Sequence, residues 1–81
     1  MQTRVAIISI IVEDNAIISD IQKLLSQYAP HIIGRFGIPH KQKEVRIISV
    51  VLDAPVDVIN ALAAALAQLE HVSTQTLLSN V

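Results

Sequence analysis

Apolar residues recur along the chain with two different spacings, and the two spacings alternate from the N-terminus to the C-terminus. Four segments are short and mostly rich in isoleucine, valine or threonine, which favours β-strands. Two longer segments repeat apolar residues every three or four positions, which is typical of amphipathic helices. The expected strands are residues 4–12, 31–38, 44–53 and 72–78, and the expected helices are residues 15–28 and 55–69.

Both expected helices have residues suited to their ends. Asp14 or Asn15 can cap the first helix by accepting hydrogen bonds from free amides of its first turn, and Pro30 ends it. Pro55 opens the second helix, where its missing N–H costs nothing, and Asp57 complements the positive end of the helix dipole. The expected apolar stripes are Ile17, Ile18, Ile21, Leu24, Leu25 and Tyr28 in the first helix and Val58, Ile59, Leu62, Leu66 and Leu69 in the second, with Gln22 and Lys23 mostly opposite the first stripe.

The order strand-helix-strand-strand-helix-strand is a split βαβ pattern. It predicts an α+β fold of the ferredoxin-like type, a βαββαβ two-layer sandwich. Its four-stranded antiparallel sheet would carry both helices on one face, with the first and third strands in the centre. No linker or low-complexity tract divides the chain, so we expect one domain over residues 1–81.

The two central strands are apolar on both faces, which a two-layer sandwich does not require. In the first strand Ile8 and Ile10 share one face while Ile7 and Ile11 share the other, and residues 45–52 repeat this pattern. Two helices cover one face only, so we expect the open face to pack against another copy of the chain, as a homodimer or tetramer. A different strand register or a third covering element is the alternative, although no residues are left over to form such an element.

The composition supports burial against a partner. A domain of 81 residues buries only about 60–65% of the surface of its unfolded chain. Yet 52% of its residues are apolar, 16% are charged and the mean hydropathy is +0.53. Apolar runs are too short for a membrane-spanning helix, and no secretory leader is recognisable, so we expect a cytoplasmic protein with no membrane partner. The absence of cysteine fits that compartment and excludes disulfides, thiolate metal sites and cysteine nucleophiles.

The most distinctive segment is Gly34–Pro39, with the sequence GRFGIP. An arginine between two glycines, beside a polar loop, can bind an anionic ligand through a bidentate contact. We therefore name Arg35, Gly37 and His40 as candidate ligand-binding residues. The alternative is that the glycines allow a bulge or a close backbone approach while Arg35 is solvated.

Basic residues also gather near this segment, at His40, Lys41, Lys43 and Arg46. Such a cluster can contact nucleic acid, but it equally protects an edge strand from unwanted pairing. No reading helix or set of stacking aromatic residues accompanies it, and the formal net charge is −1. We therefore expect no direct binding to nucleic acid.

Catalytic and metal-binding patterns are weak. The three histidines, His31, His40 and His71, show no ligand spacing, and two of them precede strands expected on opposite edges of the sheet, so only a site between subunits stays open. Ser9 and Ser49 lie in apolar strands without a base placed by a known motif. We expect a protein that is not an enzyme and holds no cofactor.

Taken from Arg4 to Leu78, the chain resembles a family of short bacterial proteins described as regulators of iron-only hydrogenase systems. The resemblance rests on Gly34–Pro39, on the strand ending Ile11-Val12-Glu13-Asp14, on the strand 47–53, and on the second helix from Asn60 through Leu69. It implies an ACT-like domain, similar in fold to the C-terminal regulatory domain of nickel-responsive repressors.

Several functional residues of those relatives have no counterpart in this sequence. Only three residues precede the first strand, where the repressors carry a DNA-binding segment, and their nickel-binding cysteine and histidine pair are missing. The first strand-to-helix loop, residues 13–15, lacks the glycine typical of ACT domains that bind amino acids. The resemblance thus implies a transcriptional regulator that senses a small molecule or a protein partner. The alternative is a small dimeric enzyme or metal-binding protein that uses a cavity between subunits.

Overall fold

The chain forms one four-stranded sheet with two helices, and the computed structural model describes residues 2–81. In chain order the strands and α-helices are β1 (Arg4–Val12), α1 (Ile18–Gln27), β2 (Ile32–His40), β3 (Val45–Ala54), α2 (Val56–Ala67) and β4 (Val72–Leu78). Two short 3-10 turns, η1 (Asn15–Ile17) and η2 (Ala29–His31), flank α1.

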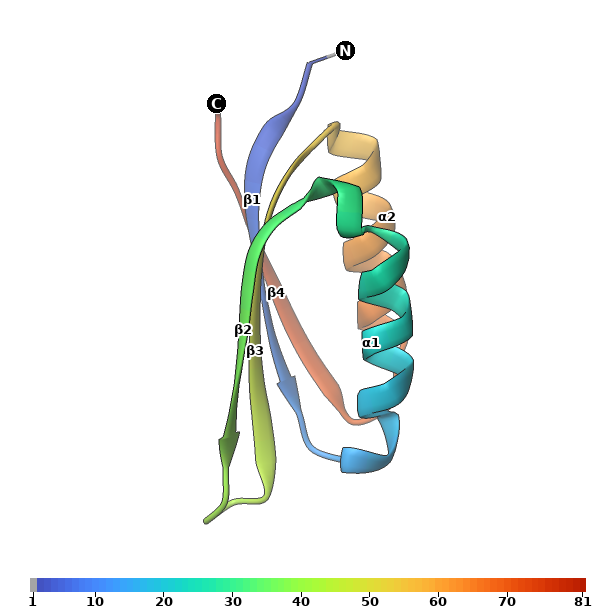
Figure 1. Ribbon diagram of the computed structural model, residues 1–81, viewed down its shortest axis with the longest axis vertical. Coiled ribbons are helices and arrows are strands. Elements are labelled where there is room, and N and C mark those ends of the chain that lie inside the picture. The colour runs from blue at the N-terminus through green and yellow to red at the C-terminus, as the bar shows by residue number, and fades with distance from the viewer. Residues whose placement is uncertain (1) are drawn as a thin grey trace.

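All neighbouring strands are antiparallel, and their order across the sheet is β2-β3-β1-β4. Both helices lie on the same side of this sheet, and no helix among residues 2–81 lies on its other side (Figure 1). The βαββαβ two-layer arrangement predicted from the sequence is therefore confirmed, with β1 and β3 in the centre as expected.

Turn chemistry explains where the first helix begins. The side chain of Asp14 accepts a hydrogen bond of 2.9 Å from the amide of Ala16, as expected for a helix cap. The cap starts the 3-10 turn η1, and α1 follows directly from it. Pro55 lies at the N-cap of α2, immediately before the first helical residue, as its missing N–H allows.

The main boundary that differs from the prediction is the end of β2. The expected strand ends at residue 38, but Pro39 and His40 also pair with β3, opposite Arg46 and Val45, and the turn comprises residues 41–44. A proline fits there because β2 is an edge strand, with one side free of ladder hydrogen bonds. As a result the tip of the β2–β3 hairpin extends beyond the N-terminal end of α1 (Figure 1).

The core lies between the sheet and the helices. Alternate residues of β1 and β3 and the centres of both helical stripes form it: Ala6, Ile8, Ile10, Val12, Ile21, Leu25, Ile48, Val50, Leu52, Ala54, Ile59, Leu62 and Leu66. No polar or charged residue among those described is fully buried. Because each fully buried large aliphatic side chain contributes about 1.5–3 kcal/mol, this layer accounts for the packing of α1 and α2 on the sheet.

Candidate functional site

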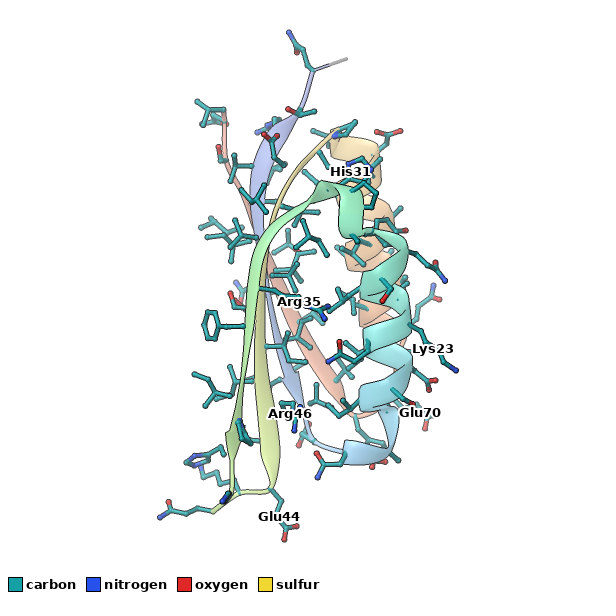
Figure 2. All side chains as sticks on the ribbon, in the orientation of Figure 1. Lys23, His31, Arg35, Glu44, Arg46 and Glu70 are labelled. Carbon is teal, nitrogen blue, oxygen red and sulfur yellow. The ribbon has the colours of Figure 1, made fainter. Side chains whose placement is uncertain are left out.

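The sheet face that carries no helix is apolar. Direct partners in the strand pairing place Ile7 beside Val51 and Leu77, and Ile11 beside Ile47. The exposed members of this open face include Ile7, Ile11, Phe36, Ile38, Ile47 and Leu77, with exposed fractions of 36–67%. Side chains project from this side of the sheet without any covering layer (Figure 2).

The polar residues of the open face are mostly uncharged. Ser9 is the direct partner of both Ser49 and Gln75, so a short polar stripe crosses the centre of the sheet. Among the described strand residues on this face, Asp53 at the end of β3 is the one with a formal charge at neutral pH. A large apolar surface with few charges is characteristic of the buried part of a protein interface.

The opposite face holds a second feature, between α1 and the edge of the sheet. A hollow of about 280 Å³ opens there, which we call the arginine hollow. Its polar lining comes from Gln22, Arg35 and Arg46, and the rest of its lining is Leu25, Phe36, Gly37 and Ile48. Arg35 and Arg46 both point to the side of the sheet that carries the helices (Figure 2).

Arg35 is oriented by a contact with α1. Its Nη2 donates a hydrogen bond of 2.8 Å to Oε1 of Gln22. The sequence pattern placed Gln22 opposite the apolar stripe, but its side chain is half-buried at the edge of the hollow. Arg35 itself is exposed, and a guanidinium has five N–H donors. Donors therefore remain available for another acceptor.

Arg46 is less well satisfied. It precedes Ile48 and Val50 on the helix-facing side of β3, and the residue is half-buried. Its Nε is fully buried and has no hydrogen-bond partner. Leaving a buried donor unpaired costs about 1–3 kcal/mol, and this is the single unsatisfied buried side-chain atom found among residues 2–81.

The two glycines of β2 differ in whether the backbone explains their presence. Gly34 lies at a register shift between β2 and β3, which agrees with the bulge interpretation. Gly37 has an ordinary negative φ, and a Cβ added to it would meet Ile48 Cγ1 at 3.8 Å and the Ile47 carbonyl oxygen at 3.9 Å, which is normal contact. Neither backbone conformation nor close packing requires a glycine at position 37.

The predicted ligand residues are thus only partly brought together. Arg35 and Gly37 line the arginine hollow, whereas His40 lines a separate hollow of about 580 Å³ between the hairpin and the start of α1. Arg46 lines both hollows, and Glu44 lines the second one. One sequence feature could have indicated Arg46 as a site residue, because it places a charge on the core-facing side of a central strand. No sequence feature indicated Gln22.

The histidines do not converge within one chain. His31 ends η2, before β2, and His71 precedes β4, so they belong to opposite edges of the sheet as expected. In residues 2–81 no group of three or more histidine, cysteine, aspartate or glutamate side chains could hold a metal ion. Over the same residues, no helix is long and apolar enough to span a membrane.

Comparison with known proteins identifies close structural relatives. Residues 4–76 match the family model described as "TM1266-like: Iron-only hydrogenase system regulator, putative". The solved structure of the uncharacterized protein TM1266 from Thermotoga maritima is similar to this chain with a TM-score of 0.90 and 28% sequence identity, over 95% of this chain and 98% of that one. Among curated proteins, none matches this chain.

Proposed function

This chain belongs to the TM1266-like family of iron-only hydrogenase system regulators, and we propose that it acts in such a system as a non-catalytic, self-associating module that senses a small ligand. The observation that supports self-association is the uncovered, apolar open face of the sheet. We define it by its exposed apolar residues Ile7, Ile11, Phe36, Ile38, Ile47 and Leu77.

A second copy of the chain is the partner that fits this face best. The face is nearly free of charge, so it offers little to a charged partner such as nucleic acid. Its apolar members extend across all four strands, which suits the flat face of another sheet. A two-fold pairing of two such faces would cover both patches with one interface.

A non-catalytic role agrees with the family description and with the chemistry at hand. Ser9 and Ser49 are direct partners on the open face, between two central strands. No histidine or carboxylate lies directly opposite them in the pairing, where a base would activate a hydroxyl. These serines instead supply the polar stripe of a surface that is otherwise suited to packing.

Light scattering over a range of protein concentrations tests the self-association. We expect a dimer or tetramer in the wild-type chain and a monomer in Ile47→Glu, because a buried unpaired carboxylate opposes association. Ala64→Glu adds the same charge on the exposed side of α2 and should leave the assembly unchanged. A folded wild-type monomer at high concentration would refute the proposed assembly.

The regulatory role has a separate test. Deletion of the gene in its native host should change the transcript level or the activity of the iron-only hydrogenase, and the wild-type gene should restore it. Restoration by Ile47→Glu should fail if assembly is required. A deletion that changes neither transcript nor activity would contradict the regulatory proposal.

A further inference from the structure

Two guanidinium groups line the arginine hollow, and its lining contains no acidic residue. Like charges that share a small space repel each other unless a counter-charge lies between them. One acidic residue to consider is Glu44, which lines the separate hollow that His40 also lines. Arg46 lines both hollows, but Glu44 does not line the arginine hollow. The chain therefore places two positive groups around one space without supplying the negative group.

Arg46 adds a donor that lacks an acceptor. Its Nε is buried without a partner, although the residue as a whole remains partly exposed. In guanidinium recognition the Nε and one Nη form a planar pair of donors that matches the two oxygens of a carboxylate or a phosphate. Arg46 lines the hollow, and its Nε has no accessible surface, so an oxyanion reaches this donor once the Arg46 side chain turns toward the hollow.

Gly37 keeps the hollow open. It lies on the same side of β2 as Arg35 and pairs with Ile48, and the space beside it could take a Cβ without a clash. A longer side chain at this position would extend into the hollow between Arg35 and Arg46. Backbone geometry does not require a glycine at position 37. A role in leaving space for a ligand would explain why a glycine stands there.

We infer that the arginine hollow is a binding site for a small oxyanion, a carboxylate or a phosphate. Arg46 and Arg35 donate to its oxygens, Gln22 holds Arg35 in position, and Gly37 provides the room. The inference rests on the proposed sensing role and specifies the class of ligand that is sensed. In the set of candidate ligand residues, Arg46 and Gln22 take the place of His40.

The same lining discriminates against zwitterions. An amino acid carries an ammonium group next to its carboxylate, and no carboxylate in the hollow is available to pair with that ammonium. Two nearby guanidinium groups would repel it. The site should therefore prefer a simple anion to the corresponding amino acid.

Calorimetry and thermal denaturation with three probes test the site. Inorganic phosphate and succinate represent the two oxyanion sources, and aspartate is succinate with an added ammonium group. We expect phosphate or succinate to bind and raise the Tm, and aspartate to bind about tenfold more weakly than succinate or worse. In nitrogen NMR, the Nε–Hε resonance of Arg46 should shift when the anion binds.

Variants locate the binding. Arg46→Gln and Arg35→Gln should each weaken affinity by about tenfold or more, which corresponds to the loss of a charge-assisted hydrogen bond. Gly37→Leu should abolish binding because its side chain would occupy the hollow, and circular dichroism should show a retained fold, since a Cβ at this position meets only ordinary van der Waals contacts. Lys43→Gln removes an equal charge from the hairpin turn, outside the lining of the hollow, and should leave affinity unchanged.

Defined results would overturn the inference. One is that phosphate and succinate change the Tm and the Arg46 resonance no more than sodium chloride of the same ionic strength does. Another is that Lys43→Gln weakens binding as much as Arg46→Gln does, or that Gly37→Leu binds normally. Light scattering on the same samples separates this site from the proposed assembly, since an intact oligomer that binds no anion refutes the site alone.

Discussion

Ile11 of β1 and Ile47 of β3 are direct partners in the central strand pair, and both face away from the helices with exposed fractions of 44% and 38%. On the other face of the same two strands, Ile10 and Ile48 are also partners, and they are almost completely buried. The two faces of the sheet thus present equivalent aliphatic pairs, of which α1 and α2 cover only one.

Self-association should make stability depend on protein concentration. An interface that forms only between folded chains stabilises them by mass action, so the Tm should rise when the concentration is raised about a hundredfold. Thermal denaturation followed by circular dichroism measures this directly. The Ile47→Glu variant should melt at a temperature independent of concentration, and a wild-type Tm that stays constant would contradict the prediction.

Two leucines should respond differently to the same truncation. Leu62 of α2 is fully buried, so Leu62→Ala should lower the free energy of unfolding by about 2–5 kcal/mol. Leu77 is 67% exposed on the open face, so in dilute protein Leu77→Ala should change it by no more than about 0.5 kcal/mol. Leu77→Ala should instead weaken self-association. Urea denaturation and light scattering separate the two effects, and equal losses of stability would contradict this assignment.

His71 should be sensitive to β-branched replacement. Its φ of 61° lies in the left-handed region, and its carbonyl accepts a hydrogen bond of 2.8 Å from the amide of Glu13. His71→Val should cost about 1–2 kcal/mol of unfolding free energy, because a branched Cβ is strained there. His71→Gly should cost less than His71→Val, and His40→Val in the exposed strand β2 serves as the control. If the two His71 variants have equal free energies of unfolding in urea, the left-handed conformation assigned to residue 71 is contradicted.

Arg4 should hold the C-terminal segment against β1. Its Nε donates to the carbonyl oxygen of Ser79 at 2.7 Å, and its Nη2 donates to Oδ1 of Asn80 at 3.2 Å. Arg4→Met keeps the aliphatic stem but removes both bonds, so we expect a loss of about 1–2 kcal/mol. Hydrogen exchange should accelerate at the Ser79 amide, which bonds to the Val5 carbonyl. Lys23→Met on α1 is the matched control, and unchanged exchange in Arg4→Met would refute the role.

The fold could be predicted because its determinants are local and periodic. The alternation in β1 and β3 and the stripes in both helices agree with the burial found in the structure, as do the positions of Asp14 and Pro55. The end of β2 was predicted too early because Pro39 was interpreted as part of a turn. Only the order of strands shows that β2 is an edge, where a proline is tolerated.

The candidate site could be predicted only in part because it depends on tertiary contact. The unusual glycine-arginine segment predicted Arg35 and Gly37 as candidate ligand residues, and both line the same hollow. Gln22 reaches Arg35 across 13 positions of sequence, from a helix position that the periodicity assigned to the solvent side. Arg46 was noted as part of a basic cluster, but the burial of its Nε without a partner depends on tertiary packing that the sequence pattern does not describe.

Strand β2 contributes to both the arginine hollow and the open face, through side chains on its two opposite sides. Arg35 and Gly37 face the hollow, while Phe36 and Ile38 are paired with Ser49 and Ile47 on the open face. This strand is hydrogen-bonded to a neighbour on one side only. If an anion shifts β2 when it binds, the two events become thermodynamically linked: whatever factor the anion applies to the assembly constant, assembly must apply to the affinity for the anion.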